Sequence, residues 1–172
     1  TAPVGAPATA PPTRTRKEAG AMISHLSHTS VFVLDQDSAK AFYTEKLGFE
    51  VRVDITMGEE FEGAGGGFRW LTVGAKDQPD LQLILSSCEM GRSPEAAEQL
   101  RALVASGAMG VGVLATDDCR QTYKELSAKG VTFLAEPAER PYGIEATLRD
   151  DSGNLISLTQ PFEFDPAAIT SG

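Results

Sequence analysis

Hydrophobic and polar positions in the first half of the chain follow the periods of four strands and one helix. Residues 49–55 alternate between apolar and polar side chains, as a half-buried strand does. Before them, the side chain of Asp37 or Ser38 can accept hydrogen bonds from the first N–H groups of a helix, and Gly48 stands where a glycine cap ends it. The pattern predicts strands at 28–34, 49–55, 68–73 and 81–85, and a helix at 39–47.

The same order of elements returns in the second half. A helix at about 93–106, with Ser93 as its cap, connects the two halves. A further helix ends at Gly130, and a strand follows it, as in the first half. An internal repeat of this kind predicts two related modules, each with the order strand, helix and three strands. The strands of the second module are predicted at 111–116, 131–134, 144–149 and 155–160.

The repeat sets the domain organisation, which is one domain at 23–160. Residues 1–22 are rich in Pro, Ala and Thr and lack hydrophobic periodicity, so we expect a flexible N-terminal arm or a non-native remnant there. Residues 161–172 are expected to form a C-terminal tail. Within the domain, module one covers about 23–86, the connecting helix about 93–106 and module two about 109–160.

The composition excludes some classes of function. Of the 172 residues, 41% are hydrophobic and 23% are charged, which is ordinary for a globular protein. The formal net charge is -9, whereas nucleic-acid-binding proteins carry a basic surface, so we expect no nucleic-acid partner. The sequence lacks an apolar stretch long enough to span a membrane and the basic-then-apolar order of a signal peptide. We therefore expect a soluble, cytoplasmic protein.

The two cysteines, Cys88 and Cys119, do not form a CxxC motif. Their number leaves open a disulfide or two free thiols, but it does not indicate a disulfide-framed secreted scaffold. Cys119 stands near the start of a predicted helix, where the pKa of a thiol can be lowered. The alternative for Cys119 is a buried, structural thiol.

Three stretches of the sequence carry a family resemblance. The first is HTSVFVLD at 28–35 followed by AFYTEKLGF at 41–49, and the second runs from TDD at 116–118 to KGV at 129–131. The third is RDDSGNLISL at 149–158. In this order and spacing they resemble the vicinal-oxygen-chelate superfamily, which includes glyoxalase I, bleomycin-resistance proteins and extradiol dioxygenases.

The resemblance implies an α+β fold in which two βαβββ modules form a curved mixed sheet around a cavity, and a homodimer. In the superfamily this cavity commonly holds a divalent metal that chelates two adjacent oxygens of a substrate and acts as a Lewis acid. Some members have no metal and sequester a drug. Because the fold hosts several chemistries, function depends on the residues of the site.

The superfamily takes its metal ligands from one position on the first strand and one on the last strand of each module. His28 fits the first position, and an imidazole there suits Zn, Ni or Fe. The other three positions hold Gln82, Val111 (or Gly110 if the register differs by one residue) and Ser157. Neither Val111 nor Gly110 can coordinate a metal, and Ser157 is a poor ligand. Glu145 has the strand parity to face the cavity, so His28, Gln82 and Glu145 are the candidate metal ligands.

The remaining candidates surround the expected cavity. Tyr142 lies in a region that borders the ligand in the superfamily, and we predict it as a catalytic residue together with Glu145. Arg69 and Trp70 alternate on a strand, so one of them should face the cavity and the other the helices or solvent. The predicted ligand-binding residues are His28, Phe32, Arg69, Trp70, Val111 and Ser157.

Two functions follow from these residues. We expect a glyoxalase/bleomycin-resistance-like protein that binds a small molecule in the cavity between the modules, with a degenerate or absent metal site. The alternative is a divalent-metal-dependent lyase, isomerase or dioxygenase of the same superfamily. Because one imidazole and one amide are fewer ligands than a catalytic metal usually has, whether the protein is an enzyme stays open.

Overall fold

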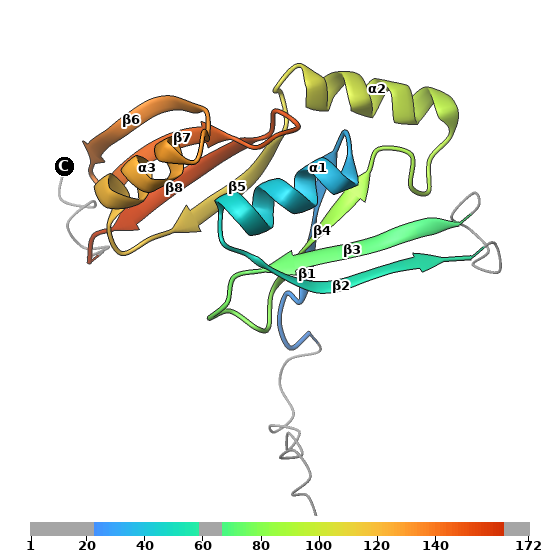
Figure 1. The fold of residues 1–172 in the computed structure, drawn as a ribbon, viewed down its shortest axis with the longest axis horizontal. Helices are drawn as coiled ribbons and strands as arrows, with labels where there is room; N and C mark the ends of the chain where they lie inside the picture. Colours follow the sequence, from blue (N-terminus) through green and yellow to red (C-terminus); the bar gives the residue numbers. More distant parts are fainter. Residues whose placement is uncertain (1–22, 59–66, 164–172) are drawn as a thin grey trace, which may run out of the picture.

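The computed structural model describes residues 23–58 and 67–163. They form two modules that lie side by side, each with a four-stranded mixed sheet (Figure 1). This confirms the predicted α+β fold with two βαβββ modules. The predicted N-terminal arm at 1–22 and most of the predicted tail, at 164–172, lie outside the described residues.

Module one has the strand order β1-β4-β3-β2, in which β1 runs parallel to β4 and the other neighbours are antiparallel. The prediction that Asp37 or Ser38 caps the helix is wrong. Asp35 is the cap, because its backbone is still extended after β1 and its side chain accepts from the Ser38 N–H at 2.7 Å. The elements are β1 (His28–Val33), α1 (Gln36–Ala41), the π-helical turn η1 (Phe42–Lys46), β2 (Glu50–Met57), β3 (Phe68–Gly74) and β4 (Gln82–Ser87).

Module two repeats the topology with the order β5-β8-β7-β6. Strand β6 continues well past the predicted end at residue 134. The pairing of β6 with β7 shifts register between Ala135 and Ala138, around Pro137, so the strand lacks the regular alternation on which its prediction depends. The elements are α2 (Pro94–Ala105), which connects the modules, β5 (Gly110–Ala115), α3 (Cys119–Ala128), β6 (Phe133–Arg140), β7 (Gly143–Arg149) and β8 (Leu155–Pro161).

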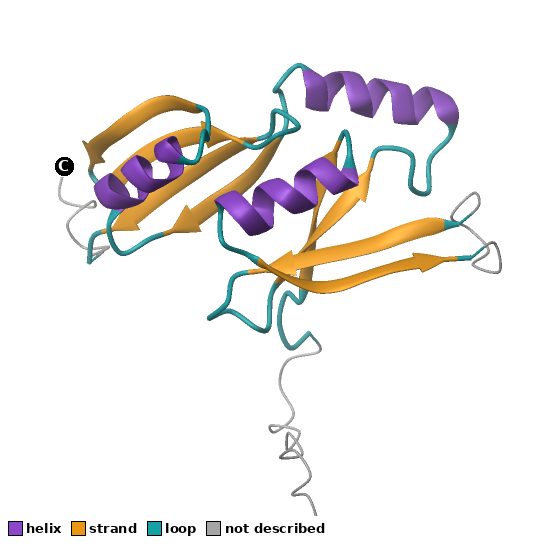
Figure 2. Cartoon of the chain, viewed as in Figure 1, coloured by secondary structure: helices purple, strands orange, loops and turns teal. Residues whose placement is uncertain are grey.

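One helix covers one face of each sheet, α1 in module one and α3 in module two (Figure 2). Apolar side chains at alternate strand positions fill the space below the helices, and the two modules share a single hydrophobic cluster. We call the face that α1 or α3 does not cover the open face of that module. The largest side chains of the shared cluster include Tyr43, Leu71, Leu85, Leu148 and Ile156.

The turn between β7 and β8 fastens the modules to each other. The hydroxyl of the fully buried Tyr43 in module one donates to Asp150 Oδ2 at 3.1 Å. Burial and the adjacent Asp150 raise the pKa of Tyr43 far above its ordinary value, so the phenol remains a donor. The Asn154 side chain amide donates to the Phe32 carbonyl at 2.9 Å and to Asp150 at 2.8 Å. These buried hydrogen bonds connect module two to strand β1.

The helices of the described part are short. The longest, α2, has 12 residues, whereas a membrane-spanning helix needs about 20. None of the helices in residues 23–58 and 67–163 has the length and apolar composition to cross a membrane.

Candidate functional site

The open face of module one brings three of the predicted site residues together. His28 on β1 lies beside Gln82 on β4 in the parallel register, so both side chains point to the same face. The Thr72 hydroxyl donates to Gln82 Oε1 at 2.7 Å and fixes the orientation of the amide. The centroids of the His28 and Trp70 rings are 6.1 Å apart, with their planes tilted by 52°.

Further aromatic side chains extend this face. Phe68 lies edge-on to Trp70 at 6.5 Å between ring centroids, and Phe32 occupies the same face of β1 as His28, four positions further along. The Arg92 guanidinium lies 4.5 Å from the centre of the Phe32 ring, a cation–π contact. We call the set His28, Phe32, Phe68 and Trp70, all of them half-buried, the aromatic face.

An open groove of about 640 Å³ borders the aromatic face at the His28 end. The His28 imidazole Nδ1 is 3.0 Å from the Ser27 hydroxyl at the edge of this groove. His25 also lines the groove, although it is not among the predicted site residues. It precedes β1, where the strand alternation that assigns side chains to faces does not apply. The groove is lined by His25, Ser27, His28, Pro79, Asp80 and Gln82.

Arg69 points to the opposite face of β3 from Trp70. Its guanidinium binds Asp54 Oδ1 and Asp37 Oδ1, each at 2.7 Å. Lys40 on α1 also binds Asp54, at 2.7 Å. Hydrogen bonds from Arg69 and Lys40 hold the pKa of Asp54 well below its usual range. The charge of Arg69 is therefore compensated on the helix-covered side, away from the aromatic face.

A second polar cluster lies on the open face of module two. Its centre is Glu145 on β7, which accepts hydrogen bonds from the Ser157 hydroxyl and, at 2.7 Å, from the Tyr142 hydroxyl. These bonds lower the pKa of Glu145, the one from Ser157 most, and raise the pKa of Tyr142. Both shifts lead away from neutral pH, where a general acid or base is most effective. The predicted catalytic roles of Glu145 and Tyr142 stay predictions.

The predicted metal ligands are divided between these places. His28 and Gln82 lie on one face, whereas Glu145 belongs to the cluster in module two and does not line the groove beside them. Within residues 23–58 and 67–163, no group of three or more His, Cys, Asp or Glu side chains is placed to hold a metal ion. Of the predicted set, the groove therefore holds one imidazole and one neutral amide, fewer than the about three protein ligands of a catalytic metal. His25 and Asp80 also line the groove, but within the described residues they are not placed to complete a metal site with His28.

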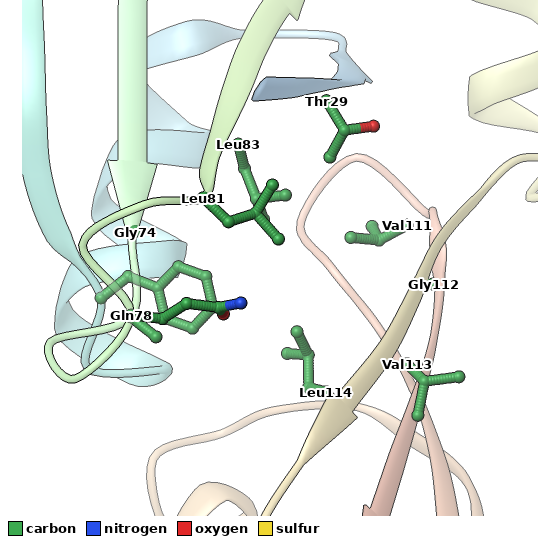
Figure 3. Close-up of a pocket in the computed structure, with 11 residues that line it drawn as sticks. Thr29, Gly74, Gln78, Leu81, Leu83, Val111, Gly112, Val113 and Leu114 are labelled. Carbon is green, nitrogen blue, oxygen red and sulfur yellow. The ribbon is translucent and has the colours of Figure 1, made fainter. Parts of the chain in front are cut away.

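Val111, the remaining predicted ligand-binding residue, lines a different pocket. This pocket lies between the modules and has a volume of about 150 Å³ (Figure 3). It is separate from the groove at His28, since the two share no lining residue. Its apolar walls include Phe49, Leu81, Leu83, Val111 and Leu114.

Both cysteines are buried and have free thiols. The Cys119 thiol donates to the Leu158 carbonyl at 3.5 Å, and burial raises the pKa of both Cys88 and Cys119. Of the two alternatives for Cys119, the structure supports the buried, structural thiol. The helix N-terminus does not lower its pKa enough to offset burial.

Comparison with known proteins identifies the family. Residues 25–158 match the profile of the Glyoxalase/Bleomycin resistance protein/Dioxygenase superfamily. The chain belongs to this superfamily. The vicinal-oxygen-chelate resemblance of the sequence motifs is thereby confirmed. The chain is also 38% identical over 133 residues to the uncharacterized protein YurT of Bacillus subtilis (strain 168), an alignment that covers 77% of this chain and 95% of YurT.

Two solved structures align with this chain over nearly their whole lengths. The crystal structure of UcmS2 is 51% identical in sequence and aligns with a TM-score of 0.73, covering 80% of this chain and 98% of UcmS2. The crystal structure of TnmS3, an antibiotic binding protein from Streptomyces sp. CB03234, is 32% identical and has a TM-score of 0.63. That alignment covers 83% of this chain and 100% of TnmS3.

Proposed function

We propose that this superfamily member binds a small aromatic molecule on the aromatic face of module one and does so without a bound metal. The observation that carries the proposal is the set of four half-buried aromatic rings on a sheet face that α1 leaves uncovered. Aromatic rings supply large apolar contact areas and favour stacked or edge-on partners. The similarity to the antibiotic-binding protein TnmS3 supports the same function.

The polar groups beside the aromatic face suit recognition of a neutral polar substituent. Because the Thr72 hydroxyl donates to Gln82 Oε1, the Gln82 NH₂ group is left to donate to a ligand. His28, next to it in the register, offers one ring nitrogen toward the groove while the other is near Ser27. A mostly apolar surface with a few oriented polar groups is typical of small-molecule sites.

A fluorescence titration tests this function directly, because Trp70 is the only tryptophan of the chain. We expect acridine and 2-naphthol to change the Trp70 emission saturably in the full-length protein treated with EDTA. Zn²⁺, Ni²⁺ or Fe²⁺ should leave the dissociation constants unchanged, and mass spectrometry should find far less than one metal ion per chain. Binding that appears only after a metal is added, and disappears on chelation, would instead support the metal-dependent alternative.

We also infer that the protein is a homodimer. Apolar side chains are widely exposed in the single chain: Leu26 and Val113 are each 68% exposed, and Leu155 on the open face of module two is 42% exposed. Patches of this kind commonly mark protein–protein contacts.

Sedimentation velocity tests this inference. It should give about twice the mass of the 18.2 kDa chain for the wild type, and the mass of a single chain for Val113→Asp. The control Leu103→Asp, at an exposed position of α2, should remain dimeric; a monomeric wild-type protein at micromolar concentration would contradict the inference.

A further inference from the structure

The pocket between the modules lies on the other side of strands β1 and β4 from His28. Thr29 and Leu83 line it, and they alternate with His28 and Gln82, which face the aromatic side. In Figure 3 the side chains of Leu81 and Leu83 face Val111 across this space. Both modules therefore supply walls, and the site is independent of the aromatic face.

The shape of the pocket depends on a bulge in β5. Val111 and Leu114 are three residues apart, so a regular strand would direct them to opposite faces. The pairing of β5 with β8 shifts register between Gly110 and Gly112, and Gly112 has a φ of +132°, which only glycine adopts readily. Figure 3 shows the result: Val111 and Leu114 both point into the pocket, whereas Val113 points away.

The packing behind the pocket is tight, so the space is not a sign of a loosely packed module. Gly74 belongs to the opposite wall. A Cβ atom added there would lie 3.3 Å from the Leu81 carbonyl oxygen and 3.0 Å from Arg52 Nε. A side chain at residue 74 would therefore crowd the Leu81 backbone and Arg52, while about 150 Å³ remains unfilled in front of this wall.

The lining selects a small and neutral ligand. Its walls are mostly apolar and contain no charged side chain within the described part of the chain, so an ion would lose its hydration without compensation. Thr29 and Gln78 are the polar side chains of the lining, and Gln78 extends across the pocket in Figure 3. Apolar cavities of about this volume accept a benzene-sized molecule.

We propose that this pocket is a second binding site, which takes a neutral, single-ring aromatic molecule with one hydrogen-bonding group such as a phenol. The ring contacts Leu81, Leu83, Val111 and Leu114, and the hydroxyl bonds to the Gln78 amide or the Thr29 hydroxyl. The ligand bridges the modules at a point that the Tyr43 and Asp150 contact does not reach.

The probe for this site is 4-fluorophenol, observed by ¹⁹F NMR with the full-length protein. We expect saturable binding to the wild type and at least a tenfold higher dissociation constant for Val111→Phe, which fills the pocket from β5. Gln78→Phe should raise the dissociation constant to the same extent, because the phenyl ring would take the space at the edge of the pocket that Gln78 lines. Residue 78 is exposed and lies in a loop, so a larger side chain there does not disturb the fold. This second variant decides the result if Val111→Phe fails to fold.

Trp70→Ala is the matched control, because it alters the aromatic face and leaves the pocket intact. We expect 4-fluorophenol to bind Trp70→Ala as it binds the wild type, and acridine to change the Trp70 emission of Gln78→Phe normally. Absence of saturable 4-fluorophenol binding to the wild type would overturn the proposal. The proposal would also be overturned if 4-fluorophenol still bound Gln78→Phe but no longer bound Trp70→Ala, since the probe would then occupy the aromatic face. Neither outcome depends on whether acridine binds.

Discussion

Replacement of Asp150 by alanine is expected to lower the free energy of unfolding by about 3 kcal/mol or more, because it leaves several buried donors without an acceptor. The Tyr43 hydroxyl would lose its Asp150 partner, and the backbone N–H groups of Ser152 and Asn154 would lose theirs. Each unsatisfied buried group costs about 1–3 kcal/mol. The substitution also removes a buried hydrogen bond between the modules, the one from Tyr43, so the effect exceeds that of deleting a surface carboxyl.

Urea unfolding followed by circular dichroism measures this loss. Asp151→Ala is the matched control, because Asp151 is the neighbouring carboxyl and its residue is exposed. We expect the control to change stability by less than about 0.5 kcal/mol, as exposed substitutions usually do. If Asp150→Ala unfolds at the same urea concentration as Asp151→Ala, the β7–β8 turn does not hold the modules together.

The order of elements could be predicted from the sequence because local signals mark each boundary. Gly48 and Gly130 end the helices with φ near +75°, a conformation that favours glycine, and both were predicted as caps. The alternation at 49–55 marks β2 in the same way. Such signals depend on residues a few positions apart, so one sequence is enough to place them.

The boundaries that were missed depend on contacts distant in sequence or on irregular backbone. Strand β6 was predicted to end at residue 134, because the register shift near Pro137 interrupts its alternation. The start of α1 was predicted too late. Asp35, Asp37 and Ser38 all have side chains that can cap a helix, and Asp35 is the cap because the backbone is still extended there, directly after β1. Propensity alone does not distinguish neighbouring polar residues.

Within the candidate site, the alternation of side chains along a strand predicts which residues share a face of the sheet. Which of these residues lie close together depends on the tertiary structure. Parity separates Trp70 from Arg69, but the ion pairs with Asp54 and Asp37 determine which one faces the helix. The separation of Glu145 from His28 results from the arrangement of the two modules, for which the sequence carries no local signal. The sequence analysis named Val111 as a ligand-binding residue, and Val111 lines the pocket between the modules, but it did not predict that Leu114 shares this lining, because the bulge at Gly112 changes the alternation of β5.

Replacement of Trp70 by alanine is expected to weaken the binding of 2-naphthol at least tenfold, the largest functional effect of a single substitution on the aromatic face. The indole lies next to both His28 and Phe68, so its removal deletes the centre of the aromatic face. Loss of a stacked ring and its apolar area amounts to about 1.5–3 kcal/mol, and 1.4 kcal/mol corresponds to a factor of about ten in affinity.

Isothermal titration calorimetry measures this change, since Trp70→Ala has lost the fluorescent reporter. Trp70→Phe should retain most of the affinity, because a phenyl ring still stacks on the ligand. Phe162→Ala removes an aromatic side chain that is 44% exposed and lies after β8 in module two, so it should bind 2-naphthol as the wild type does. Equal affinity of the wild type and Trp70→Ala would place the ligand elsewhere, and a loss in Phe162→Ala alone would direct attention to the open face of module two.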